Sequence, residues 1–121
     1  MRIFVVENHQ DTLKSLELYL ADLGHEVATA RTIESALVDL PSFGADMLIC
    51  DIGLPDGTGW ELLRKAQLPK PVFAVAMSGF GMNADSASSR EAGFRHHLLK
   101  PFKVAELDKL LDEAAAECTP T

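Results

Sequence analysis

The feature that most constrains the fold is an apolar run that ends in one carboxylate, Met47-Leu48-Ile49-Cys50-Asp51. The next segment breaks the chain with Pro55, Gly57 and Gly59. A short apolar run bounded by turn residues is typical of a strand buried on both faces. Such strands belong to parallel sheets, which bind ligands at the carboxyl ends of their strands. We therefore expect Asp51 at the functional edge of a sheet, and a turn-capping aspartate is the alternative.

The rest of the chain alternates between apolar runs and segments with helical spacing. Strands are predicted at residues 3–6, 27–30, 47–51, 72–77 and 94–99. Helices are predicted at 11–23, 32–40, 60–67, 83–92 and 104–116, with Asp11 and Thr32 as N-caps and Trp60, Leu63 and Ala66 facing inward. Right-handed crossovers then give a doubly wound, flavodoxin-like α/β fold with a five-stranded parallel sheet, order 2-1-3-4-5, and helices on both faces. Residues 1–118 form one domain, and 119–121 form a polar tail.

Composition excludes several kinds of partner. The net charge of −7 and the pI near 4.9 argue against direct binding of nucleic acid, which needs a basic patch. No apolar run approaches the roughly 18 residues of a membrane span. The two cysteines suit a reducing compartment without a disulfide framework. We expect a cytoplasmic monomer or weak dimer that does not contact a membrane directly.

Polar side chains follow four of the five predicted strands: Glu7 and Asn8, Asp51, Ser78 and Lys100. The ends of parallel strands meet at one edge, so these side chains should converge. An aspartate can act as a nucleophile toward phosphorus. A divalent cation such as Mg²⁺, held by Asp51, by Glu7 or Asn8 and by a backbone carbonyl, would neutralise the carboxylates and an entering phosphoryl group. Lys100 and Ser78 can bind phosphoryl oxygens.

This layout resembles the receiver domain of two-component response regulators. The resemblance covers almost the whole chain and rests on four segments in order: Val5-Val6-Glu7-Asn8, Asp51 with Pro55 and Gly59, Ser78-Gly79, and Lys100-Pro101-Phe102. It implies a phosphoprotein of a phosphorelay, with a chemotaxis-regulator-like fold. Asp51 would be phosphorylated by a histidine kinase or a histidine phosphotransfer protein, with slow phosphoryl transfer and self-dephosphorylation at Asp51.

The resemblance also implies roles for individual residues. Lys100 matches the family's lysine, Ser78 matches its switch hydroxyl, and His97 stands where the family places a switching aromatic residue. The Gly53 backbone carbonyl would join Asp51, Glu7 and Asn8 around Mg²⁺. The Lys100–Pro101 peptide bond should be cis. One departure is Asn8, since the family has a second acidic residue there. Asn8 offers an oxygen without charge, so weaker Mg²⁺ binding is expected.

Two further expectations concern signalling and signal lifetime. Signalling should pass through the last helix-strand-helix face, where the Ser- and Ala-rich segment 83–92 has little apolar surface to hold it. Gly53 and Phe80 occupy the positions that flank the hydrolytic water in the family. Neither side chain can orient that water, so loss of the phosphoryl group should be slow.

Other functions fit these residues less well. The same fold acting as a pseudo-receiver, a phosphorylation-independent interaction module, is supported by Asn8. A phosphatase of the haloacid-dehalogenase type needs an aspartate two residues after the nucleophile, where this chain has Gly53. A P-loop enzyme is excluded because the G-x-x-x-x-G-K-[ST] motif is absent. A flavodoxin-like cofactor carrier needs a phosphate-binding loop where this chain has Glu7-Asn8. The sequence leaves open whether this is a stand-alone regulator or part of a hybrid kinase.

Overall fold

The computed structural model describes residues 1–79 and 86–118. Its centre is a five-stranded sheet in the order β2-β1-β3-β6-β7, with every neighbouring pair parallel. The strands are Arg2–Val6 (β1), Glu26–Ala30 (β2), Met47–Asp51 (β3), Phe73–Ser78 (β6) and His96–Leu99 (β7). Counted as main strands, this is the predicted order 2-1-3-4-5, so the doubly wound α/β fold is confirmed.

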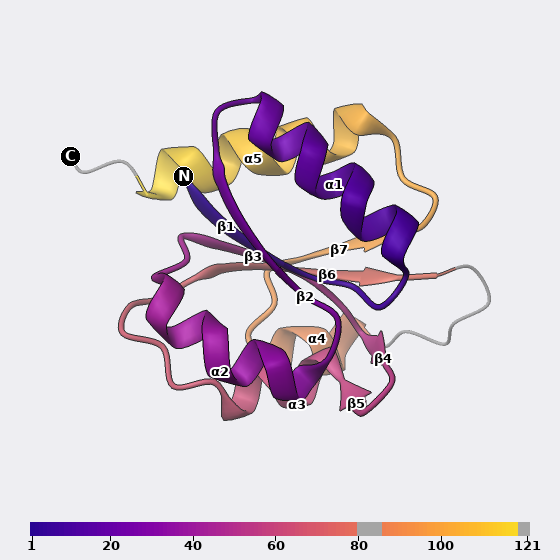
Figure 1. Ribbon diagram of the computed structural model, residues 1–121, viewed down its shortest axis with the longest axis vertical. Helices are drawn as coiled ribbons and strands as arrows, with labels where there is room; N and C mark the ends of the chain where they lie inside the picture. Colours follow the sequence, from indigo (N-terminus) through magenta and orange to yellow (C-terminus); the bar gives the residue numbers. More distant parts are fainter. Residues whose placement is uncertain (80–85, 119–121) are drawn as a thin grey trace.

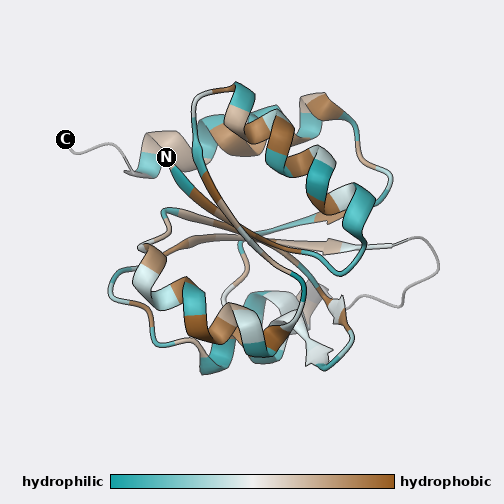
Figure 2. Ribbon diagram, viewed as in Figure 1, coloured by the Kyte–Doolittle hydropathy of each residue, from teal (hydrophilic) through white to brown (hydrophobic). Residues whose placement is uncertain are grey.

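Helices cover both faces of the sheet (Figure 1). They are Gln10–Asp22 (α1), Ile33–Phe43 (α2), Gly59–Lys65 (α3), Ser86–Ala92 (α4) and Val104–Cys118 (α5). In Figure 1, α1 and α5 lie above the sheet, and α2, α3 and α4 lie below it. Figure 2 shows polar and apolar residues alternating along α1 and α2, as expected for helices with one apolar side.

The core has two layers because successive strand residues point to opposite faces. Ile3, Val5 and Ile49 are completely buried on the side of α1 and α5. Phe4 and Leu48, which alternate with them, are completely buried on the side of α2 and α3. Both faces of the central strands are therefore buried away from solvent, which explains why their sequences are apolar without alternation.

Several predicted boundaries were wrong. α1 begins at Gln10 with His9 as its N-cap, so Asp11 lies inside the helix. α2 continues through Pro41 and ends at Gly44, whose φ of 70° is left-handed. The loss of one backbone hydrogen bond at Pro41 is offset by the burial of Leu40 and the packing of Phe43 on the core. β7 begins at His96, later than predicted.

The inward face of α3 includes the predicted residues and one that was not predicted. Leu62 is its completely buried residue, whereas Trp60, Leu63 and Ala66 pack on the core while partly exposed. The Trp60 indole reaches α4, where its Nε1 donates to Ser89 Oγ at 2.9 Å. An indole N–H needs such a partner when buried, and this explains its place at the edge of the core. The first residues of the predicted helix 83–92 lie outside the described residues.

A small hairpin that was not predicted follows Asp51. It pairs Gly53–Leu54 (β4) with Gly57–Thr58 (β5). Between them, Asp56 accepts hydrogen bonds from the backbone N–H groups of Ile33 at 2.9 Å and Glu34 at 3.0 Å. These bonds cap α2 and lower the pKa of Asp56. The loop after Asp51 is thus tied to the start of α2.

Gly59 allows the end of β3 to pack closely against the start of α3. Its N–H donates to the Ile52 carbonyl at 2.8 Å. A Cβ at this position would lie 2.6 Å from the Asp51 carbonyl oxygen and 3.0 Å from Cys50 Sγ. Only a residue without a side chain fits here, and the contact fixes the backbone that carries Asp51.

We predict that Gly59→Ala lowers the free energy of unfolding by about 1–3 kcal/mol, because the added methyl forces backbone shifts in a closely packed site. Urea denaturation measures the change. Gly79→Ala is the matched control, since a Cβ at Gly79 meets no atom of the described residues within 4 Å. Equal stability of the two variants would contradict the close-packing argument.

Candidate functional site

An ammonium group joins two carboxylates at the carboxyl edge of the sheet. Glu7 follows β1, Asp51 ends β3, and Lys100 follows β7. The Lys100 Nζ donates to Glu7 Oε2 at 2.6 Å and to Asp51 Oδ2 at 2.9 Å. The structure therefore brings together three of the strand-end residues singled out in the sequence.

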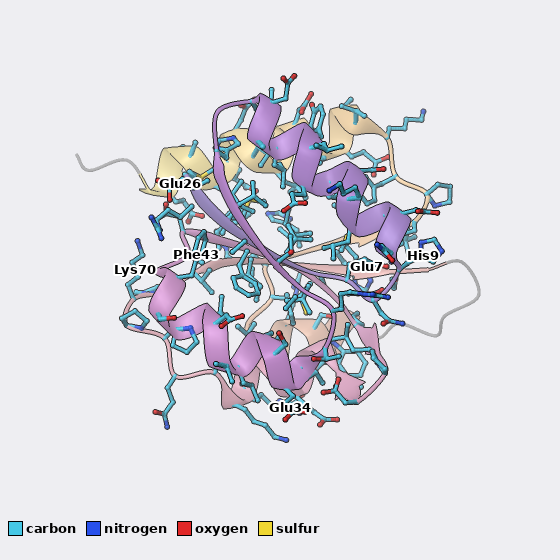
Figure 3. The ribbon with its side chains drawn as sticks, viewed as in Figure 1. Glu7, His9, Glu26, Glu34, Phe43 and Lys70 are labelled. Carbon is cyan, nitrogen blue, oxygen red and sulfur yellow. The ribbon has the colours of Figure 1, made fainter. Side chains whose placement is uncertain are left out.

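Burial makes this cluster electrostatically strong. Glu7 is 1% exposed, Asp51 8%, and the Lys100 side chain 21%. Figure 3 shows Glu7 near the end of the central strands, between the layers of helices, with His9 further out. Burial raises the pKa of Glu7, and the neighbouring Asp51 raises it further. Burial alone would lower the pKa of Lys100, but its bonds to Glu7 and Asp51 outweigh that effect and raise it.

The remaining oxygens of the two carboxylates face loop backbone. Glu7 Oε1 accepts from the His9 N–H and Asp51 Oδ1 from the Gly53 N–H, each at 3.2 Å. A depression of about 370 Å³ opens beside them. It is lined by Glu7, Asn8, His9, Thr12, Asp51, Gly53 and Lys100. Asp51 is thus reachable from solvent although its own surface is mostly covered.

Arg31 is a neighbour of the site that the sequence argument missed. Its Nε and Nη2 donate to the Asn8 backbone carbonyl at 3.3 and 3.1 Å. Arg31 directly follows Ala30, the last residue of β2. Arg31 therefore stands directly after a strand, like the other residues of the site, and its position in the sequence carries the same signal.

Ser78 and His97 form a second polar contact on neighbouring strands. The Ser78 Oγ, completely buried at the end of β6, lies 2.7 Å from the His97 Nε2. Burial lowers the pKa of the half-buried His97. The Lys100–Pro101 peptide bond is cis, as the resemblance predicted. Phe80, the second residue proposed to modulate hydrolysis, lies outside the described residues, whereas Gly53 is exposed beside Asp51.

The donor set fits a magnesium ion held partly by water. In residues 1–79 and 86–118, no group of three or more His, Cys, Asp and Glu side chains is placed to hold a metal. Glu7 and Asp51 supply two carboxylates that share a single ammonium group, so the cluster keeps a net negative charge. Mg²⁺ commonly binds through one or two carboxylates, other oxygens and several waters. Asn8 and Gly53 can add neutral oxygens.

The fold and this acidic edge define the class of protein, and comparison with known proteins gives the family. Residues 3–112 match the family model described as response regulator receiver domain. The chain is 30% identical over 109 residues to the KDP operon transcriptional regulatory protein KdpE of Escherichia coli, covering 90% of this chain and 48% of that protein. It is 31% identical to the virulence sensor protein BvgS of Bordetella bronchiseptica, covering 96% of this chain and 10% of BvgS.

Comparison with solved structures supports the same family. The CheY-like receiver domain from Methylobacillus flagellatus superposes with a TM-score of 0.82 at 26% identity, covering 94% of this chain and 98% of that one. The chain belongs to the response regulator receiver domain family. Receiver domains of this family generally bind Mg²⁺ and interact with histidine kinases. The chain spans about half the length of KdpE and a tenth of BvgS. None of the helices in the described part combines the length and apolarity that a bilayer span needs.

We predict that Lys100→Met lowers the free energy of unfolding by about 1–3 kcal/mol in the presence of a chelator, because it leaves two mostly buried carboxylates without a counter-charge. Denaturation at neutral pH measures the loss. Lys103→Met, at an exposed position three residues later, is the control and should change little. A Lys100→Met variant as stable as the control would show that the ion pair contributes no net stability.

Proposed function

We propose that this domain accepts a phosphoryl group on Asp51 from a histidine kinase or a histidine phosphotransfer protein. The observation that carries the proposal is the Asp51 carboxylate, reachable from the depression and hydrogen-bonded to Lys100 at 2.9 Å. A carboxylate oxygen of Asp51 attacks phosphorus while the bond from phosphorus to the donor nitrogen breaks. The product is an acyl phosphate, and the electron pair of the broken bond stays on the donor imidazole.

The neighbouring side chains have separate tasks in this reaction. In the unphosphorylated domain, Lys100 is hydrogen-bonded to Asp51. After transfer, Lys100 supplies a positive charge for a phosphoryl oxygen. Glu7 keeps Lys100 in place, since its Oε2 lies 2.6 Å from Nζ. The Gly53 N–H, which donates to Asp51 Oδ1 at 3.2 Å, orients the carboxylate. Ser78, at the end of the adjacent strand, can offer its hydroxyl to the new phosphoryl group.

Asp51, Glu7, the Gly53 carbonyl and the Asn8 side chain would hold Mg²⁺. When bound, the ion supplies positive charge that offsets the repulsion between an incoming phosphoryl group and the carboxylates. Asn8 contributes no charge, so we propose that the ion binds more weakly here than in a site with a third carboxylate.

The signal would pass to a partner protein that binds the face formed by α4, β7 and α5. Two large apolar side chains are exposed there, Leu99 at 64% and Val104 at 56%. Exposed apolar groups near a switch region are suited to a protein partner.

We predict that acetyl phosphate with Mg²⁺ adds one phosphoryl group to the wild-type domain and none to Asp51→Asn, because an amide cannot act as the acceptor. Intact-mass spectrometry measures the product. Asp22→Asn is the matched control: it removes an exposed aspartate at the end of α1 and should still be labelled. Labelling of Asp51→Asn would overturn the assignment.

The alternative, a pseudo-receiver that acts without phosphorylation, is favoured by Asn8 alone. The same measurement separates the two functions. A wild-type domain that stays unlabelled at high Mg²⁺ and acetyl phosphate would support the pseudo-receiver.

We predict that Asn8→Asp tightens Mg²⁺ binding about fivefold, or ~1 kcal/mol, because a charged ligand replaces a neutral one. Calorimetric titration of the unphosphorylated domain measures the change. Gln10→Glu, which adds the same charge two residues later at an exposed position, is the control. The same affinity in Asn8→Asp and wild type would remove Asn8 from the ligand set, and the same gain in both variants would indicate a general charge effect.

A further inference from the structure

The contact between Ser78 and His97 has a chemical property that the proposed phosphoryl transfer does not use. Ser78 Oγ and His97 Nε2 lie 2.7 Å apart. His97 pairs with Ala76 on β6, two residues before Ser78, so both side chains lie on the α4 side of the sheet. Ser78 is completely buried, and His97 is its side-chain partner in the described part of the chain.

A hydroxyl has only one proton to donate. In the unmodified domain, His97 is half-buried and no carboxylate of the described residues is bonded to it, which favours the neutral imidazole. A neutral imidazole with its proton on the other ring nitrogen can accept the buried Ser78 proton at Nε2. In this arrangement the Ser78 proton is unavailable to any other acceptor.

An anionic phosphoryl group next to Ser78 changes this arrangement. Phosphoryl oxygens accept hydrogen bonds, so Ser78 must turn its proton toward them. His97 keeps its contact with Ser78 only if Nε2 carries a proton and donates it to Oγ. Both the other neutral tautomer and the imidazolium ion meet this requirement, and the added negative charge favours the imidazolium ion.

We propose that His97 is a positioning residue whose protonation releases the Ser78 hydroxyl to a phosphoryl group on Asp51, so that phosphorylation and proton uptake by His97 favour each other. This inference rests on the proposed function of Asp51. It assigns to His97 a hydrogen bond that a phenylalanine or tyrosine ring could not make in the same way, because neither ring has a nitrogen that titrates near neutral pH.

Among residues 1–79 and 86–118, Ser78 is the polar side chain bonded to His97. On α4, which packs against β7, the charged residues Arg90 and Glu91 are exposed, and the buried Ser89 is bonded to Trp60. Lys100, three residues after His97, is bound to Glu7 and Asp51. The neighbouring His96 lies on the α5 side and pairs with Glu113 at 2.5 Å.

The test is an NMR titration of the ¹⁵N-labelled imidazoles between pH 5 and 8.5, with and without beryllofluoride at saturating Mg²⁺. Beryllofluoride is a stable stand-in for a phosphoryl group on a carboxylate. In the unmodified protein, the ¹⁵N shifts should show Nε2 of His97 as the unprotonated nitrogen. Beryllofluoride should move the proton to Nε2 and raise the pKa of His97 by about 1 unit, a tenfold coupling.

Two controls separate the hydrogen bond from general effects. In Ser78→Ala, beryllofluoride should raise the pKa of His97 by less than half of the wild-type shift, since only the charge effect remains. His96 reports on general changes and should move little in either protein. A pKa of His97 that stays constant or falls in the wild type, or that rises equally in Ser78→Ala, overturns the proposal.

Reciprocity gives a second readout that does not depend on assigning a tautomer. Beryllofluoride affinity of the wild type, divided by that of His97→Gln, should increase up to about tenfold from pH 8 to pH 5.5. The glutamine side chain of this variant can still contact Ser78 but does not titrate. A constant ratio overturns the inference about His97 while leaving Asp51 as the acceptor, whereas a domain that acetyl phosphate does not label removes both proposals.

Discussion

The ionic contact of Lys100 with Glu7 and Asp51 is the interaction on which the functional edge depends. These residues are 93 and 49 positions from Lys100 in sequence, and the parallel sheet brings them within 2.6 and 2.9 Å. Two buried carboxylates without a counter-charge would repel each other and lose hydration. The group that holds the loop after β7 on the sheet is therefore also the group that we propose binds a phosphoryl oxygen beside Asp51.

Further contacts extend this edge across the sheet. Arg31 ties the end of β2 to the backbone after β1, and Ser78 ties the end of β6 to His97 on β7. Because Asn8 is neutral and Arg31 binds its carbonyl, the edge carries less negative charge than a site with a third carboxylate. The positive groups of this edge then include Lys100, which is bonded to Asp51, and Arg31, which is bonded to the backbone at Asn8.

The sheet and its polar edge could be predicted from sequence because both follow from local patterns. Apolar runs such as 47–51 identify buried strands, and the residue after each run must lie at the carboxyl edge. Element boundaries and loop contacts were missed for a different reason. The capping of α2 by Asp56 joins residues 23 and 22 positions apart, and the bond between Ser78 and His97 depends on strand register. Periodicity shows which side of α1 is apolar, but it does not fix the first residue of the helix, which is Gln10.

The hydrogen bonds that Asp56 accepts from the start of α2 also limit which sequence changes this protein tolerates. They end on backbone amides, so the side chains of Ile33 and Glu34 can change without breaking them. The length of the chain between β2 and α2 cannot change so freely, because an inserted residue would carry those amides away from the carboxylate. The loop that positions Gly53 beside Asp51 thus fixes the length of a distant connection through bonds that do not involve the side chains of that connection.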